Sequence, residues 1–291
     1  MKPPPFDYFA PSTTEEAISL LGEYAERAKI LAGGQSLVPL LNFRLARPQV
    51  LVDINRIQQL SYIVESEEGL RIGALTRHRA LETSPLVQAK CPILAFAARF
   101  IGHLAIRNRG TFGGSLAHAD PAAEFPVVLA ALGSRISLRS PRGERSLSPE
   151  EFFLSYLTTA LQPPEILVEA WVPTLGPRTG WGFQELALQQ GAFALVAVAA
   201  LITLDERGVC REARIALGSV APVPVRAKAA ENLLRGEKPN PKLLAEAARL
   251  VTEVTEPTTD IHASAEYRTA MAEVYARRAL QDAWTRARPE G

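Results

Sequence analysis

The chain has 291 residues, 47% of them hydrophobic, which is enough for roughly two ordinary globular domains with substantial cores. Its formal charge of +1 gives no electrostatic reason to expect a nucleic acid or an acidic membrane surface as a partner. Cys91 and Cys210 form no Cys-x-x-Cys pair, so we expect free thiols in a reducing compartment and neither an iron–sulfur cluster nor a structural zinc on this chain.

Neither a targeting signal nor a membrane span is evident in the sequence. The N-terminal residues lack the apolar run of a signal peptide. The most apolar segment, residues 192–202, is too short to cross a bilayer and is bounded by turn and charged residues. We therefore expect a cytoplasmic protein with no transmembrane segment.

The first part of the chain predicts a small α/β lobe. Ser12-Thr13-Thr14-Glu15 has the pattern of a capping box, which opens an amphipathic helix ending near Glu26. Residues 29–31 and 50–54 are expected to be short strands, with a short helix at residues 37–45 between them. A strand, a helix and a strand in this order favour an α/β unit.

The strand at residues 29–31 leads into Ala32-Gly33-Gly34-Gln35-Ser36-Leu37, here called the first glycine motif (residues 32–37). Glycine lacks a Cβ, so its backbone can adopt positive φ and let a bulky ligand approach the amide groups closely. Ser36 is the expected N-cap of the helix that follows, with Pro39 tolerated in its first turn. A turn that enters a helix in this way presents backbone N–H groups to an anion.

The segment up to about residue 175 predicts a mixed α+β lobe. Two β-hairpins are expected, one around the turn at residues 66–69 and one around a Ser-Pro-Arg-Gly turn at residues 140–143. The other expected elements are helices at residues 76–82, 86–101 and 121–132, a short helix from Ser148, and a strand at residues 166–172.

Residues 107–124, here called the second glycine motif, read Arg-Asn-Arg-Gly-Thr-Phe-Gly-Gly-Ser-Leu-Ala-His-Ala-Asp-Pro-Ala-Ala-Glu. Three glycines, two hydroxyls and two arginines lie within its first nine residues. Asp120 followed by Pro121 has the pattern of an N-cap and first helical residue, so the motif predicts a turn that enters a helix. Two such turns, far apart in sequence, are suited to holding a long phosphate-bearing cofactor from two sides.

Residues 176–180, which contain two glycines and a proline, are the expected linker to a separate domain at residues 181–291. Strands followed by helices favour an α+β domain of about 110 residues, a normal domain size. The expected strands lie at residues 181–188, 194–204 and 210–217, and the expected helices at residues 226–234, 241–253 and 265–287.

Several familiar motifs are absent from the sequence. It contains neither G-x-G-x-x-G nor G-x-x-x-x-G-K-[ST], so a Rossmann fingerprint and a P-loop are unsupported. The four histidines have no metal-ligand spacing, and G-x-S-x-G is missing, which removes the support for a catalytic metal or a hydrolase nucleophile elbow. Spacing alone thus indicates a phosphate-containing ligand held at two backbone sites.

The two glycine motifs, together with Gly191-Ala192-Phe193-Ala194-Leu195 (the third motif, residues 191–195), resemble the signatures of the medium, FAD-binding subunit of molybdenum hydroxylases. Aerobic carbon monoxide dehydrogenase is a member, and xanthine dehydrogenase carries the equivalent domain. The likeness extends over nearly the whole chain. It implies an α+β fold with a two-lobed FAD-binding domain of the PCMH (vanillyl-alcohol-oxidase-like) type at residues 1–175, its lobes at about 1–57 and 58–175, followed by a smaller α+β C-terminal domain with a three-stranded sheet and helices.

The resemblance also implies that FAD lies between the lobes without a covalent bond. Its diphosphate would be held by amides of both glycine motifs, and Leu167 would lie near the isoalloxazine. No residue is expected to be catalytic or to bind a metal. The implied cofactor-binding residues are Ala32, Gly33, Gly34, Gln35, Ser36, Leu37, Thr111, Gly113, Gly114, Ser115, Ala117, Asp120 and Leu167.

By the same resemblance the chain is an electron-transfer subunit. FAD would take electrons from [2Fe–2S] clusters on a small partner subunit and pass them to an external acceptor, while a molybdenum cofactor on a large molybdopterin subunit carries out the hydroxylation. The implied assembly is a dimer of heterotrimers, and the sequence does not select the substrate or the acceptor. Two alternatives stay open: a self-sufficient flavin oxidase of the same fold, and a scaffold subunit without flavin.

Individual residues also keep alternative interpretations. The glycines could form tight turns only, and Asp120 could be an N-cap with or without a cofactor contact. His118 is interpreted as a structural hydrogen-bonding residue, and Arg107 and Arg109 as braces of the loop more than as phosphate ligands.

The chain departs from the family pattern in two places. Ala105 stands where the family commonly has Gln, and Leu188, Gln189 and Ala192 stand where it often has two Arg and an Asp. Any polar contact that those side chains would make at the flavin edge or with a partner subunit is left open, whereas the phosphate-binding motifs are unaffected.

Overall fold

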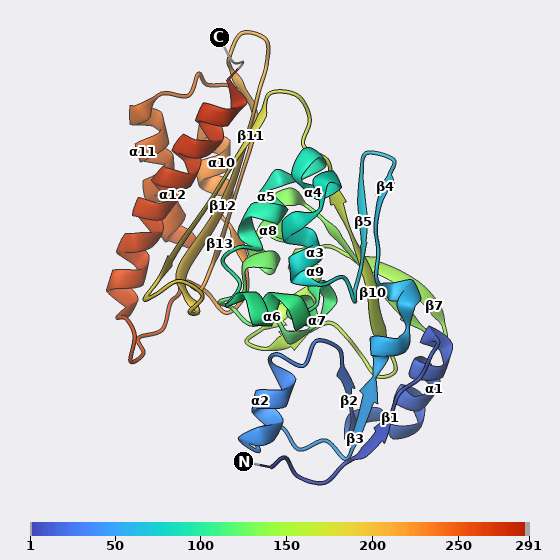
Figure 1. Cartoon of the computed structure of the whole chain (residues 1–291). Helices are drawn as coiled ribbons and strands as arrows, with labels where there is room; N and C mark the ends of the chain where they lie inside the picture. The colour runs from blue at the N-terminus through green and yellow to red at the C-terminus, as the bar shows by residue number, and fades with distance from the viewer. Residues whose placement is uncertain (1, 289–291) are drawn as a thin grey trace.

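The computed structural model describes residues 2–288, in which three main sheets are flanked by helices (Figure 1). The N-terminal lobe is a three-stranded parallel sheet with the order β1-β3-β2, and α1 packs Ala17 and Leu21 against Val50 and Val52 of this sheet. Its elements are β1 (Asp7–Phe9), α1 (Thr14–Tyr24), η1 (Ala25–Arg27), β2 (Ala28–Leu31), α2 (Leu37–Asn42), β3 (Val50–Asp53) and η2 (Ile54–Arg56).

Two helix caps in this lobe differ from the sequence prediction. Thr13, not Ser12, is the N-cap of α1: Thr13 Oγ1 accepts the N–H of Glu16 (3.1 Å), and Glu16 Oε2 accepts the N–H of Ser12 (2.8 Å). The capping-box pattern occurs twice, one residue apart. The cap is the first residue of the second copy, but Glu16 bonds back to Ser12 and not to Thr13. Ser36 stands at the N-cap position of α2 as predicted, but its backbone is already in the helical region (φ −101°, ψ −49°) and its hydroxyl accepts no capping hydrogen bond.

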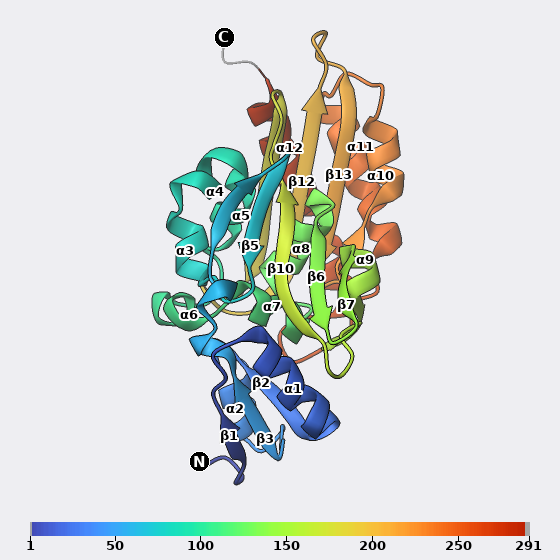
Figure 2. The same ribbon diagram turned by 90° about the vertical axis from the view of Figure 1, so that its right-hand side faces the viewer.

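The second lobe is an antiparallel five-stranded sheet with the order β4-β5-β10-β6-β7, so β10 lies at its centre between two hairpins (Figure 2). Both hairpins are confirmed. The elements of this lobe are η3 (Gln58–Leu60), β4 (Ile63–Ser66), β5 (Gly69–Gly73), α3 (His78–Thr83), α4 (Pro85–Lys90), α5 (Pro92–Ala97), α6 (Leu104–Arg109), α7 (Phe112–His118), α8 (Glu124–Leu132), β6 (Arg135–Ser140), β7 (Gly143–Leu147), α9 (Pro149–Phe152), β8 (Phe153–Ser155), β9 (Thr158–Thr159) and β10 (Ile166–Pro173).

Two helix predictions in this lobe were wrong in their bounds. The helix expected at residues 86–101 is divided into α4 and α5, because Pro92 has no N–H and Cys91 leaves the helical region (φ −145°, ψ 62°). The helix expected from Pro121 begins at Glu124. Asp120 Oδ1 accepts the N–H of Ala122 (2.9 Å), which fixes a turn ahead of the helix and makes Ala123 the N-cap residue.

The C-terminal part is a sheet with the order β11-β12-β13-β14, and the helices that follow it in the chain cover one of its faces. The predicted three strands are extended by β14, whose two residues are too few to give a periodic signal. Strand β11 starts at Thr179, inside the segment predicted as a linker. The elements are β11 (Thr179–Ala187), β12 (Ala194–Leu204), β13 (Cys210–Gly218), β14 (Val225–Arg226), α10 (Lys228–Leu234), α11 (Pro241–Leu250), η4 (Val251–Val254) and α12 (Ala265–Ala287).

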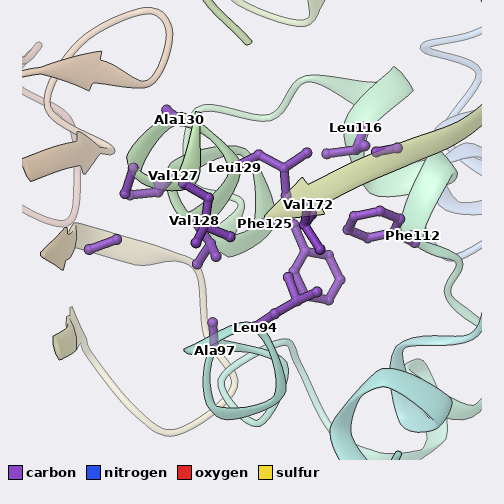
Figure 3. Close-up of a cluster of buried hydrophobic side chains, with 14 of the residues drawn as sticks. Leu94, Ala97, Phe112, Leu116, Phe125, Val127, Val128, Leu129, Ala130 and Val172 are labelled. Atoms are coloured by element: carbon purple, nitrogen blue, oxygen red, sulfur yellow. The ribbon is translucent and has the colours of Figure 1, made fainter. Parts of the chain in front are cut away.

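Helices α5 and α8 lie between the two large sheets, so the body is a stack of alternating helix and sheet layers (Figure 1). Every residue of β12 is buried, because α12 covers one face of its sheet and the inner helices cover the other. Every residue of α8 is buried as well, and Leu94, Phe112, Phe125 and Val172 from four different elements meet around it (Figure 3). None of the described helices is long and apolar enough to cross a membrane.

The closest approach of helix to sheet occurs where α12 crosses β11. A Cβ added at Gly182 would overlap the carbonyl oxygen of Ala279, and one at Gly180 would overlap that of Ala283. Glycine and alanine are therefore needed on the two surfaces, since a larger side chain would hold the helix away from the strand.

We expect Gly182→Ala to lower the free energy of unfolding by about 1–3 kcal/mol, because the new methyl group forces α12 off the sheet. Thermal unfolding followed by circular dichroism measures this. Gly176→Ala is the matched control, because a Cβ there meets only Thr179 Oγ1 at 3.9 Å. Equal melting temperatures for the two variants would contradict the close-packing argument.

Candidate functional site

The two glycine motifs meet through their backbones. A Cβ added at Gly33 would lie 2.6 Å from the carbonyl oxygen of Arg109 and 2.8 Å from the Cα of Gly110, so no residue with a side chain fits there without a shift of the chain. The N-terminal lobe thus touches the second lobe at the points where the sequence predicts ligand binding. Figure 2 shows β2 and α2 below α6 and α7.

The first glycine motif presents a run of uncommitted amides. Within the described part of the chain, no acceptor receives a hydrogen bond from the N–H groups of residues 33–37. Gly34 has a left-handed backbone (φ +73°), and Gln35 Nε2 donates to the carbonyl oxygen of Gly33 (3.0 Å). A left-handed residue among right-handed ones gathers successive N–H groups into a concavity that suits an anion. Ala32 and Leu37 bound this concavity on the strand and helix sides.

The second glycine motif is helical, not the open turn that the sequence predicted. Its glycines lie inside α7, whose N-cap is Thr111. The N–H of Gly114 donates to Thr111 Oγ1 (3.2 Å), that of Ser115 to the carbonyl of Thr111 (3.0 Å), and that of Gly113 to the carbonyl of Ala74 (2.8 Å). These three amides therefore have acceptors within the protein, and their predicted contacts with the cofactor stay predictions. The Ser115 hydroxyl, which is half-buried, has no partner among the described residues.

The remaining predicted site residues are spread around α7. Ala117 is exposed on that helix, and Asp120 lies in the turn after it, with His118 Nε2 at 3.9 Å from Asp120 Oδ2. Leu167 lies on β10, and its side chain is buried in the core of the second lobe. The neighbouring Val168 accepts the N–H of Ala74 through its carbonyl (2.9 Å), which connects this strand to the segment that supports α7.

His78 forms a hydrogen bond with the backbone of the second motif, a role that the sequence did not predict. Its ring is buried, and its Nε2 lies 2.9 Å from the carbonyl oxygen of Thr111. Burial lowers the pKa of His78 to about 4, outweighing the effect of this hydrogen bond, so the ring is neutral and Nε2 carries the hydrogen. Gly110 packs on the ring, since a Cβ there would meet His78 Cε1 at 2.8 Å. A single buried histidine has no pattern in the sequence.

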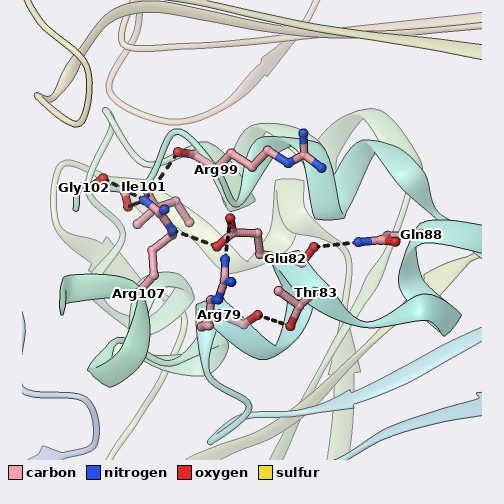
Figure 4. Close-up of polar contacts among 8 residues, drawn as sticks. All are labelled: Arg79, Glu82, Thr83, Gln88, Arg99, Ile101, Gly102 and Arg107. Carbon is pink, nitrogen blue, oxygen red and sulfur yellow. Dashed lines mark hydrogen bonds and ion pairs between the residues drawn. The ribbon is translucent and has the colours of Figure 1, made fainter. Parts of the chain in front are cut away.

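Arg107 braces the loop before the motif, as the sequence interpretation held (Figure 4). Its Nε pairs with Glu82 Oε2 (2.9 Å), and its Nη1 donates to the carbonyls of Gly102 (2.9 Å) and Ile101 (3.2 Å). Both partners of the ion pair are largely buried. The guanidinium of Arg107 therefore fixes the turn that leads into α6.

The third motif also reaches this region. Gly191 has a left-handed backbone (φ +79°), and a Cβ there would lie 2.8 Å from the carbonyl oxygen of Gly102, next to α6. Of the departures from the family pattern, Leu188 is exposed on this loop, Ala192 donates its N–H to the carbonyl of Gln189 (3.1 Å), and Ala105 is exposed on α6. The loop tip carries Phe193, which is 76% exposed.

Two carboxyl groups, those of Glu124 and Glu185, are buried and have raised pKa values. Burial raises the pKa of Glu124, the first residue of α8, to about 8, and the nearby Asp120 adds to this. Burial likewise raises the pKa of Glu185, on β11, to about 9, and the charge of Glu124 adds to this. Glu185 Oε2 has no hydrogen-bond partner among the described residues. The described residues contain no group of three or more His, Cys, Asp or Glu side chains that could hold a metal ion.

Residues 4–175 match the FAD binding domain in molybdopterin dehydrogenase, and residues 181–283 match the CO dehydrogenase flavoprotein C-terminal domain. The chain belongs to this family of flavoprotein subunits. Among its relatives is 6-hydroxypseudooxynicotine dehydrogenase complex subunit alpha of Paenarthrobacter nicotinovorans, 44% identical over 99% of this chain and 98% of that protein. The carbon monoxide dehydrogenase medium chain of Hydrogenophaga pseudoflava is 38% identical over 98% and 99%.

Two solved structures superpose closely on this chain. The carbon monoxide dehydrogenase of Hydrogenophaga pseudoflava that lacks the Mo-pyranopterin moiety of the molybdenum cofactor superposes with a TM-score of 0.96 at 40% identity, covering 98% of this chain and 99% of that chain. Quinoline 2-oxidoreductase from Pseudomonas putida 86 gives 0.94 at 40% identity, covering 99% of both chains.

The predicted family, the α+β fold, the oxidoreductase class and FAD as the cofactor of this domain are thereby confirmed for the FAD-binding subunit. The division into domains and the individual cofactor contacts stay predictions.

The buried neutral His78 predicts a loss of stability in acid. The unfolded chain binds a proton at His78 near pH 6.5 but the folded chain only near pH 4, so the free energy of unfolding falls as the pH falls between these values, by about 1.4 kcal/mol per pH unit. His78→Gln keeps a donor toward Thr111 and should remove this slope. Urea unfolding at pH 4 to 7 measures it, with the exposed His262→Gln as control. A slope in His78→Gln equal to that of the unchanged protein would refute the assignment.

Glu185 predicts the opposite dependence, over a window from about pH 4.5 to about pH 9. The folded chain holds its proton up to about pH 9 and the unfolded chain only to about pH 4.5, so the stabilising contribution is lost as the pH rises between these values. Glu185→Gln should therefore gain stability over the unchanged protein above pH 7. The same unfolding series extended to pH 9 tests this. Glu206→Gln, on the surface, should follow the unchanged protein; a Glu185→Gln curve parallel to it would contradict the buried acid.

Proposed function

We propose that this chain is the FAD-carrying electron-transfer subunit of a multi-subunit molybdenum hydroxylase. It receives electrons from [2Fe–2S] clusters on a small partner subunit and passes them through non-covalently bound FAD to an external acceptor. The observation that carries the proposal is the backbone contact between two glycine motifs inside a fold that matches a carbon monoxide dehydrogenase chain over 98% of its length.

The described residues fit FAD. A diphosphate carries two negative charges, and the amides of residues 33–37 provide an uncommitted row of donors at the junction of the lobes. The missing side chain of Gly33 lets the second motif pack against it, since a Cβ there would lie 2.6 Å from the carbonyl oxygen of Arg109, and Gly34 allows the left-handed backbone that gathers these amides. FAD supplies the redox chemistry when bound, whereas the protein binds it and sets its surroundings. On this proposal residues 1–175 hold the flavin and residues 181–291 form the second domain.

The partners belong to the proposal as well: a large molybdopterin subunit, in a dimer of heterotrimers with the small subunit. Relatives named for carbon monoxide and for a nicotine derivative share the whole length of this chain, so the chain by itself does not select the substrate. Free buried thiols at Cys91 and Cys210 fit a cytoplasmic location.

The first test of the proposal is a visible absorption spectrum of the purified chain, repeated on the filtrate after denaturation. We expect an oxidised-flavin spectrum whose chromophore is released as FAD. Gly33→Val should weaken FAD binding by about tenfold or more, because the new side chain drives the motifs apart. Gly22→Val in α1 is the control, since a Cβ there meets only Pro164, at 3.8 Å or beyond.

Purification of the tagged chain from its native cells tests the remainder. Molybdenum and iron that co-purify in fixed ratio support the hydroxylase assembly, whereas FAD alone points to a self-sufficient flavin oxidase. A colourless chain that fails to take up added FAD would leave only a scaffold role.

A further inference from the structure

Two side chains outside both glycine motifs join them. Asn55 Nδ2 donates to the carbonyl oxygen of Ala32 (2.7 Å), and Asn55 Oδ1 accepts a hydrogen bond from Arg77 Nη2 (2.7 Å). Arg77 Nη1 in turn donates to the carbonyl oxygen of Arg109. We call this chain of three hydrogen bonds the Asn55–Arg77 link. It runs from the residue just before Gly33 to the carbonyl against which Gly33 packs.

The Asn55 end of the link is held firmly. Asp53 Oδ1 accepts both the backbone N–H (2.9 Å) and the side-chain Nδ2 (2.6 Å) of Asn55, and Asp53 Oδ2 accepts the hydroxyl of Tyr8 (2.6 Å). Burial alone would raise the pKa of Asp53, but these hydrogen bonds lower it, so the carboxylate stays ionised. The amide of Asn55 is therefore oriented before any ligand arrives.

The Arg77 end is fixed by its backbone. Arg77 and Thr111 form an antiparallel bridge in which the N–H of His78 donates to the carbonyl of Gly110 (3.1 Å) and the N–H of Phe112 to the carbonyl of Thr76 (2.8 Å). Arg77 thus belongs by its main chain to the second motif and by its side chain to the first. A planar guanidinium donates from two separate nitrogens in a fixed geometry, whereas a lysine has a single nitrogen for both acceptors.

Arg77 has no direct ion-pair partner in the described part of the chain. Both of its side-chain partners are neutral oxygens, and among residues 2–288 no carboxylate lies within 4.0 Å of its guanidinium. Burial lowers the pKa of Arg77, the nearby cation Arg109 adds to this, and the carboxylate of Asp53 opposes it. A half-buried cation at the junction of two motifs, beside an uncommitted row of amides, leaves a positive potential that an anionic ligand would neutralise.

We propose that Asn55 and Arg77 are positioning residues that set the separation of the two glycine motifs, and that the charge of Arg77, which no direct ion pair among the described residues neutralises, favours the diphosphate of FAD at their junction. The proposal rests on the FAD site proposed above. It differs from a purely structural pin, which would stabilise the fold equally with and without FAD and would not depend on salt.

The test is a double-mutant cycle on FAD affinity, with flavin-free protein titrated by fluorescence. Arg77→Met should raise the Kd for FAD by about tenfold to one hundredfold, because it removes the charge and both bonds. Asn55→Ala should raise it less, and the double variant should match Arg77→Met, since either change breaks the same link. Arg77→Lys keeps the charge and should recover part of the affinity.

Salt dependence separates the charge from the fold. Between 50 mM and 500 mM NaCl the Kd of the unchanged protein should rise, and that of Arg77→Lys should rise similarly, whereas Arg77→Met should respond less. Arg56→Met is the matched control: it removes a neighbouring exposed cation that takes no part in the link. Melting temperatures of the flavin-free variants report any loss of folding, and if Arg77→Met does not fold, Arg77→Lys and Asn55→Ala carry the comparison.

Wild-type affinity and salt response in Arg77→Met would overturn the proposal, as would effects of the two single changes that simply add. An unchanged protein that does not bind FAD at all is a different result. It would refute the FAD site itself, and the role of Arg77 would fall with it.

Discussion

The structure depends on one backbone contact, that of Gly33 against the chain from Arg109 to Thr111. Because two main chains meet there without side chains between them, their polar groups need partners from elsewhere. Asn55 and Arg77 satisfy the carbonyls of Ala32 and Arg109, while the segment ahead of α3 takes the amides of the second motif. The row of uncommitted amides at residues 33–37 belongs to the first motif, and the second motif provides the backbone against which Gly33 packs.

The sequence predicted the location of this junction but not its form. Glycine pairs at the start of a helix are a local signal, and both motifs lie where that signal indicates. That α7 continues through Gly113 and Gly114 could not be predicted, because its stability comes from Thr111 as cap and from Ala74 packed against Gly113, a residue distant in sequence. Ser36 precedes α2 as predicted, but its hydroxyl makes no capping hydrogen bond, because its backbone is already helical.

Burial explains the remaining differences. The strands of β12 and β10 were recognisable as apolar runs, whereas the roles of His78, Glu124 and Glu185 follow only from being enclosed by elements far away in the chain. A charged side chain in a sequence is ordinarily read as exposed. Here helices α5 and α8 pack against two sheets at once. Polar residues on these helices and on the strands that face them are therefore shielded from water on both sides.

The contact of α12 with β11 bears on how the chain folds during synthesis. The glycines of β11 and the alanines of α12 fit only against each other, yet the ribosome delivers α12 after all the strands that it covers. Until then, the β12 face formed by Val196, Val198 and Ile202 has no cover. The chain of both glycine motifs is synthesised before α12. These motifs can therefore meet a cofactor while one face of the last sheet is still without its helix.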